Sequence, residues 1–247
     1  MIALFLRLIL PLFAYTFVTT AIYVAVPFGP LEATGISAVI IIPALLWIYY
    51  SDQKKRGYTL AESFHLRGSF IFICLFGITL CILGNYIVEL LGLTRISKAY
   101  QEAVDALYTP PLTTQILFSG FLIPAAEELI FRGMMFASLR DKLFFWLSAL
   151  LSAGLFAFYH GNLPQGVYAF LIGLAAAWLY EKTKTLLAPY VLHISANLLS
   201  LFITNTRLSD SLFEGRYTVA FLAVAACIAV CCIVWINWKN KPKEDIV

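Results

Sequence analysis

The feature that most constrains the fold of this chain is a succession of apolar runs, each close in length to a membrane-spanning helix. Crossing the hydrocarbon core of a bilayer takes about 20 apolar residues in helical conformation. Eight runs of the 247-residue sequence come near this length, at residues 4–27, 33–50, 69–93, 112–137, 143–160, 165–181, 185–204 and 217–238. The sequence therefore predicts an all-α, polytopic membrane helix bundle of about eight transmembrane helices.

Composition favours the same fold class over a soluble domain. The chain is 61% hydrophobic and 13% charged, whereas soluble domains average roughly 45–50% apolar and 25% charged residues. The formal charge of +3 does not indicate nucleic-acid binding, so the expected surroundings are the lipid bilayer. We expect a single membrane domain over residues 1–247, whose first run is an uncleaved span because it is longer than the apolar core of a signal peptide.

Two features outside the runs complete the predicted architecture. Residues 94–108 mix charged and apolar positions as an amphipathic surface helix does. Lys and Arg are distributed unevenly, with twelve on the side of the N-terminus and four on the other side. Because basic loops stay cytoplasmic, we predict a multi-pass cell-membrane protein with cytoplasmic N- and C-termini. The twelve residues are Arg7, Lys54, Lys55, Arg56, Arg67, Arg140, Lys142, Lys182, Lys184, Lys239, Lys241 and Lys243.

Three ionisable residues interrupt the fourth run: Glu127, Glu128 and Arg132. Each such group costs roughly 2.5–3.5 kcal/mol at the centre of a spanning helix, so it marks a candidate functional site. Glu128 and Arg132 are four residues apart with the acid first, which is the favourable order for an ion pair on one helix face. Glu127 points about 100° away on the same helix. We therefore expect Glu127 to be left for chemistry or for a partner on another helix.

Two further polar sets lie in later runs. Phe156 and His160 end the fifth run, and His193 and Asn197 lie four residues apart in the seventh. Taken singly, His160 could be an interfacial histidine, and His193 with Asn197 could be a polar clasp between helices. Taken together with Glu127, they predict one shared site.

A Glu, two His and an Asn brought together could hydrolyse an amide in two ways. In one, a desolvated Glu acts as general base toward water, and one His shares that water or protonates the leaving amine. The other His and the Asn amide then donate hydrogen bonds to the tetrahedral oxyanion. In the other, two His and one Glu form a catalytic zinc shell with an open fourth position. The residues by themselves leave both mechanisms open.

The three motifs E-E-x-x-x-R, F-x-x-x-H and H-x-x-x-N, in this order on successive runs, resemble the CPBP family. This family, also called Abi, comprises the CAAX prenyl protease type 2 and bacteriocin-processing or self-immunity proteins. The resemblance covers about residues 112–205, the expected catalytic core. It implies a CAAX-type intramembrane endopeptidase that hydrolyses a peptide bond in a membrane-associated peptide or membrane-anchored protein.

The resemblance also implies a role for each residue. Glu127 and His160 would activate water, and His193 and Asn197 would form the oxyanion site. The supporting positions would be Glu128, Arg132 and Phe156. The family is described both as metalloprotease and as glutamate-dependent without metal. We favour no cofactor and keep Zn²⁺, bound by Glu127, His160 and His193, as the alternative.

Two other functions fit parts of the pattern. A non-catalytic membrane protein that binds a bacteriocin or another partner, as in self-immunity, would need fewer of these side chains. A proton-coupled transporter could also use an intramembrane Glu and His, but the sequence has no inverted repeat. The short loops favour a bacterial chain.

Helix geometry adds an expectation about depth. A straight fifth helix that starts near Leu143 would lift His160 well above Glu127, at 1.5 Å per residue. We therefore expect residues 138–146 to run partly along the inner surface and residues 161–165 to dip into the membrane. The same arithmetic favours substrate access from the inner leaflet or the cytoplasm.

Overall fold

The computed structural model describes residues 2–66, 68–206, 208 and 216–241, and the regular elements within these ranges are all helices. Their order along the chain is α1 (Ile2–Ala25), α2 (Pro30–Lys55), α3 (Leu60–Ser63), α4 (Phe70–Leu90), α5 (Leu93–Ile96), α6 (Lys98–Tyr108), α7 (Leu112–Gln115), the π-helical η1 (Ile116–Leu122), α8 (Ile123–Glu128), the π-helical η2 (Leu129–Phe136), α9 (Ala137–Arg140), α10 (Phe145–Tyr159), α11 (Leu163–Thr183), α12 (Leu187–Thr206) and α14 (Thr218–Lys239).

Seven helices in the described part of the chain are long and apolar enough to cross a membrane. They are α1 from Arg7 onward, α2, α4, the continuous helix from α7 to α9, α11, α12 and α14. The prediction of an all-α, polytopic membrane bundle is confirmed. The fifth run differs from a full span, because α10 has only 15 residues. It ends before Gly161, whose positive φ of 71° is readily adopted by glycine.

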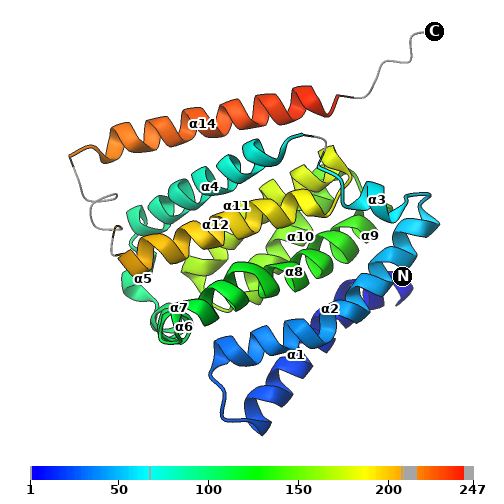
Figure 1. The fold of residues 1–247 in the computed structure, drawn as a ribbon, viewed down its shortest axis with the longest axis horizontal. Coiled ribbons are helices and arrows are strands. Elements are labelled where there is room, and N and C mark those ends of the chain that lie inside the picture. Colours follow the sequence, from blue (N-terminus) through cyan, green and yellow to red (C-terminus); the bar gives the residue numbers. More distant parts are fainter. Residues whose placement is uncertain (1, 67, 207, 209–215, 242–247) are drawn as a thin grey trace.

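The long helices run side by side, with α1 and α14 at opposite edges of the bundle (Figure 1). Helix α14 packs on α4, and α1 packs on α2. The inner helices approach closely where small residues face them, as is common in membranes. A Cβ atom on Gly77 of α4, for example, would lie 2.3 Å from the carbonyl oxygen of Leu192 in α12. Gly77 therefore lets α4 support the part of α12 that carries the second histidine motif.

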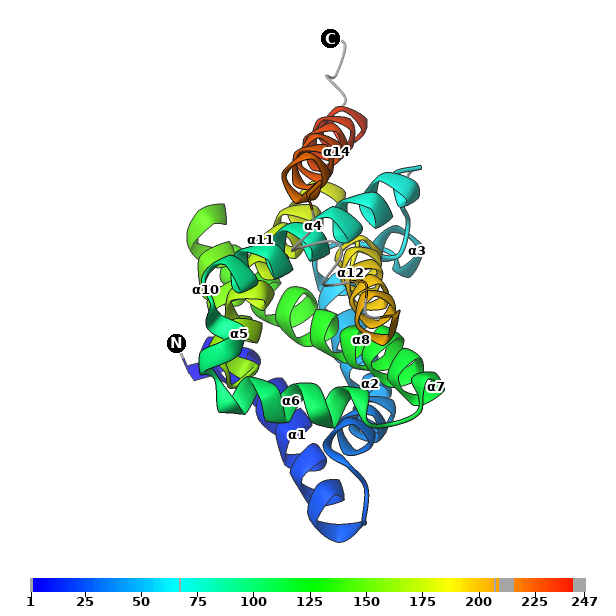
Figure 2. The same cartoon turned by 90° about the vertical axis from the view of Figure 1, so that its left-hand side faces the viewer.

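The two ends of the bundle differ in character. At one end, α6 lies across the ends of the long helices (Figure 2). The predicted surface helix at 94–108 is thus present as two pieces, α5 and α6, divided at Ser97, whose hydroxyl accepts a hydrogen bond from the Tyr100 N–H at 3.2 Å. At the other end lie α3, α9 and the C-terminal end of α2 (Figure 1), where the basic residues Lys54, Lys55 and Arg140 cluster. The four basic residues on the side away from the N-terminus are Arg95, Lys98, Arg207 and Arg216. Of the basic residues used to orient the chain, Arg67, Arg207 and Lys243 lie outside the described residues, and the orientation of the termini stays a prediction.

Candidate active site

The helix that carries Glu127 and Glu128 contains two π-helical segments, η1 and η2, on either side of α8. A π-helical turn shifts the backbone hydrogen-bond register, and such turns often occur at functional sites. Here side chains of neighbouring helices bind carbonyl groups of these segments. Asn197 of α12 donates from Nδ2 to the Ser119 carbonyl at 2.9 Å, and Ser152 of α10 donates from Oγ to the Phe131 carbonyl at 2.8 Å. The irregular backbone thus fixes α10 and α12 relative to Glu127.

Glu128 lies at the centre of the buried polar cluster. Its Oε1 accepts hydrogen bonds from Arg132 Nη1 at 2.9 Å and from His193 Nδ1 at 2.8 Å. Arg132 and Glu128 are fully buried, and His193 is nearly so. The ion pair expected from the four-residue spacing is present. The second partner, His193, was not expected, because no pattern within one helix shows which residue of another helix will face it.

Glu127 points to the other side of His193. Its Oε2 lies 3.8 Å from His193 Nε2, and it accepts no hydrogen bond within the described residues. The imidazole of His193 is therefore held between two carboxylates. Because an ionised carboxylate can only accept, the contact with Glu128 assigns the donated proton to Nδ1 and directs Nε2 toward Glu127.

The Phe156 ring contacts three polar side chains, those of Arg132, His160 and His193. The Arg132 guanidinium lies 4.6 Å from the ring centroid, a cation–π contact. The rings of His160 and His193 meet the Phe156 ring edge-on, with centroids 4.8 and 5.7 Å away. Phe156 therefore packs against all three side chains and helps to orient them.

His160 occupies the end of α10, directly before the turn into α11. Its Nδ1 lies 2.9 Å from the Phe156 carbonyl oxygen, which accepts the Nδ1 proton and leaves Nε2 as an acceptor. Asn162, two residues further on, stabilises the turn. Its Nδ2 donates to the His160 carbonyl at 3.1 Å, and its Oδ1 accepts from the Gln165 N–H at 3.0 Å. This N-cap of α11 fixes the position of His160.

One cavity of about 250 Å³ joins the motifs. Its walls include Glu127, His160, His193 and Asn197, the four side chains that the sequence predicts as catalytic, and also Phe156. Glu128 and Arg132 are not part of its walls. The structure therefore brings the four predicted catalytic residues to one hollow and places the predicted bracing pair behind it.

The expected detour of the chain around the site is wrong in part. Residues 138–140 continue the fourth helix as α9, and α10 starts only at Phe145. Measured from Arg140, Glu127 is about 20 Å along its helix, and His160 is about 23 Å along α10 from Phe145, at 1.5 Å per residue. Residues 141–144 form the short turn between the two helices, with Asp141, Lys142 and Phe144 exposed. Counted from this turn, Glu127 and His160 lie at similar distances along their helices. The start of α11, directly after the turn that follows α10, does line the cavity through Pro164 and Gln165.

The expected access from the inner leaflet or the cytoplasm stays a prediction. The walls of the cavity run from Glu127 to α6, and α6 lies at the end of the bundle opposite to α9 (Figures 1 and 2). Hydropathy does not reveal this, because the depth of a residue in a span does not say from which end a hollow between helices is reached.

The described residues contain no group of three His, Cys, Asp or Glu side chains that could hold a metal ion. Glu127, His160 and His193 line one cavity but do not form such a group in this arrangement, and His193 is engaged by a carboxylate at each ring nitrogen.

Comparison with known proteins places this site in context. Residues 109–199 match the family described as type II CAAX prenyl endopeptidase, Rce1-like. The "Putative membrane peptidase YdiL" of Bacillus subtilis (strain 168) is 31% identical over 146 residues, which are 59% of this chain and 57% of that protein. The "UPF0177 protein YxdF" of Lactococcus lactis subsp. lactis (strain IL1403) is 28% identical over 170 residues, 65% of this chain and 88% of that protein. The chain thus spans just over half the length of the Bacillus relative. No solved structure matches this chain significantly.

Proposed function

We propose, from the premise that residues 109–199 belong to the Rce1-like family of type II CAAX prenyl endopeptidases, that this multi-pass membrane protein is an intramembrane endopeptidase. The observation that carries the proposal is the shared cavity. Side chains from three helices, Glu127, His160, His193 and Asn197, line it together. Hydrolysis needs a base, a proton donor and oxyanion donors around one reacting bond, and these four side chains can supply them.

The reaction starts with a water molecule between Glu127 and His160. Glu127 takes a proton from the water as the water oxygen bonds to the carbonyl carbon of the substrate, and the C=O π electrons move to the oxygen. The tetrahedral intermediate then collapses: the C=O bond reforms, the C–N bond breaks, and the leaving nitrogen receives the proton that Glu127 took from the water, either directly or through His160 Nε2. The products are a carboxylic acid and an amine.

The oxyanion would be bound by His193 and Asn197. One Asn197 amide hydrogen goes to the Ser119 carbonyl, and the second remains for the oxyanion. His193 donates from Nδ1 to Glu128, so Nε2 can donate as well only when the imidazole carries both protons. Glu128 and Arg132 would therefore act by holding His193, and not by touching the substrate.

The proposed substrate is a peptide or membrane-anchored protein in the bilayer, and the proposed orientation has both termini in the cytoplasm. Zn²⁺ remains the alternative source of the activated water. Activity that persists in the purified protein after exhaustive chelation, with no stoichiometric zinc bound, would rule out that alternative.

The test compares peptide termini by mass spectrometry in cells that carry wild type, Glu127→Gln or Glu89→Gln at equal membrane levels. Glu89, at the end of α4, pairs with Arg95 at 2.9 Å outside the cavity and serves as the matched control. We expect termini made by the wild type to fall on the order of 10²–10⁴-fold with Glu127→Gln and to persist with Glu89→Gln. Identical termini in all three strains would contradict the protease function and favour a non-catalytic binding or immunity role.

A further inference from the structure

Helix α6 turns one face toward the catalytic cavity. Tyr100, Val104, Leu107 and Tyr108 of this helix line the hollow, and their spacing of four, three and one residues places them on one side of a helix. Gln101, Glu102 and Asp105 are exposed on the other side. The apolar face of this amphipathic helix is thus directed at the site and not at the surrounding lipid.

Apolar residues of three long helices complete this end of the cavity. Leu31 lies at the start of α2, Val88 near the end of α4 and Leu201 in the last turns of α12, and all three line the hollow. These helix ends lie next to α6 (Figures 1 and 2). We call the six residues Leu31, Val88, Tyr100, Val104, Leu107 and Leu201 the apolar compartment. Two polar side chains, Asn85 and Ser200, line the same end of the hollow.

The helix that closes the compartment is fixed at its C-terminal end. Gln115 Nε2 donates to the carbonyl oxygens of Tyr108 at 3.0 Å and Pro110 at 2.8 Å, and the Tyr108 hydroxyl lies 3.5 Å from Ser200 Oγ of α12. Val104 and Leu107 are therefore held in place against the hollow by the turns that follow them.

The hollow has room for a short stretch of substrate. Its volume of about 250 Å³, the space of roughly eight water molecules, is enough for one peptide bond and one side chain. We propose that the catalytic end receives the scissile bond and that the apolar compartment receives an uncharged, apolar side chain next to that bond. Val104 and Leu107 are then specificity-determining residues. This inference rests on the proposed function for its biological meaning.

The first test does not depend on cleavage. Ser200→Cys places a thiol at the compartment of the full chain, purified in detergent. The thiol is reacted with methyl, butyl or negatively charged sulfonatoethyl thiosulfonate. The reaction is followed by mass spectrometry of the peptide that contains residue 200. We expect the butyl reagent to react at least tenfold faster than the charged one. Leu107→Trp, which fills the compartment, should slow the butyl reagent at least tenfold. Gln101→Trp, the same substitution on the exposed face of α6, should not.

The second test uses the peptide termini of the cells described above. Leu107→Trp should remove the termini made by cleavage next to bulky apolar residues and keep those made by cleavage next to small residues. Leu107→Ala should shift cleavage toward sites with larger apolar residues. Any one of three results would contradict the proposed compartment. These are equal labelling rates for the charged and apolar reagents, equal effects of Leu107→Trp and Gln101→Trp on labelling, and unchanged cleavage-site residues in both Leu107 variants. If labelling behaves as expected but Glu127→Gln changes no termini, the protease function fails and the apolar binding compartment stands.

Discussion

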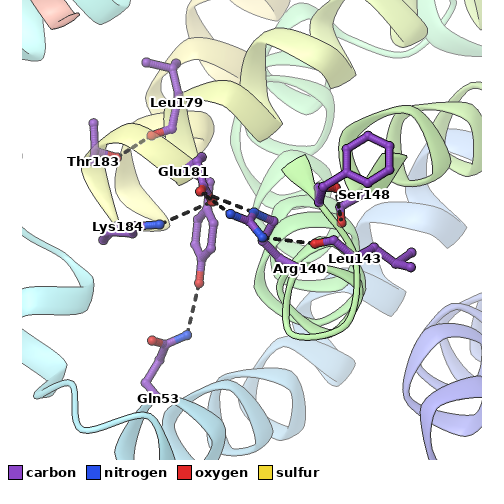
Figure 3. Close-up of polar contacts among 10 residues, drawn as sticks. Gln53, Arg140, Leu143, Ser148, Leu179, Glu181, Thr183 and Lys184 are labelled. Carbon is purple, nitrogen blue, oxygen red and sulfur yellow. Dashed lines mark hydrogen bonds and ion pairs between the residues drawn. The ribbon is translucent and has the colours of Figure 1, made fainter. Parts of the chain in front are cut away.

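Two Arg–Glu pairs in this molecule have nearly the same nitrogen–oxygen distance and very different exposure to water. Arg132 and Glu128 lie 2.9 Å apart with side chains 0% and 1% exposed. Arg140 and Glu181, at the basic end of the bundle, lie 3.0 Å apart with side chains 35% and 22% exposed (Figure 3). Because water can reach only the second pair, loss of one member leaves a solvated charge there and an unsolvated one in the first pair.

The comparison extends to a second partner of each acid. Glu128 also accepts a hydrogen bond from His193 at 2.8 Å, and Glu181 also pairs with Lys184 at 3.2 Å. Figure 3 shows Arg140 and Lys184 approaching Glu181 from two sides. The basic end thus balances its charges within reach of water, while the site balances its charges only among buried side chains. The free energy of unfolding should therefore depend strongly on the buried pair at the site and weakly on the pair at the basic end.

The largest effect is expected for Arg132→Gln. This variant leaves Glu128 buried without its cation, which should lower the free energy of unfolding by about 3–5 kcal/mol. The measurement is an unfolding titration of the purified protein in mixed micelles, with Arg140→Gln as the matched control. Equal losses in the two variants would show that burial does not separate the two pairs.

An intermediate effect is expected for His193→Leu, which removes the second partner of Glu128. A hydrogen bond to a charged group contributes about 1.5–3 kcal/mol, so the same titration should show a loss in this range, together with loss of the wild-type peptide termini. Lys184→Leu removes the second partner of Glu181 and is the matched control. A loss as small as that of the control would mean that His193 does not help to balance the buried charge of Glu128.

The smallest effect is expected for Arg140→Gln itself. A half-exposed ion pair contributes about 0–1 kcal/mol and is screened by salt, so the loss should shrink between 0.01 and 1 M salt, concentrations at which the Debye length falls from about 30 to 3 Å. Arg140 also donates from Nη1 to the Leu143 carbonyl at 3.0 Å. A loss that is large and independent of salt would assign the role of Arg140 to this turn between α9 and α10 instead of to the ion pair.

Much of the architecture and of the site residues could be predicted from the sequence. Apolar runs determine spans because the bilayer requires a helix of a given length, and the described part of the chain has seven candidate spans and one shorter apolar helix. The Glu128–Arg132 pair could be predicted because a four-residue spacing is local to one helix. The four cavity residues could be named because polar groups at membrane depth are rare.

Other features depend on how helices meet, and the sequence alone was misleading there. The contact between His193 and Glu128, 65 residues apart, depends on the rotation and depth of two helices. The π-helical turns around α8 depend on the side chains of α10 and α12 that bind the freed carbonyls. The depth of His160 depends on where the fourth helix ends, and hydropathy locates helix ends only to within a few residues.

The sequence by itself thus determined a polytopic bundle and the chemical groups of its site, because helix periodicity and the cost of buried charge act on each helix separately. Only the tertiary structure decided that His193 lies between Glu127 and Glu128, that the Arg132 guanidinium packs on the Phe156 ring, and that α6 forms a wall of the cavity. These relations are set by packing between helices, and the spacing of residues along one helix carries no information about that packing.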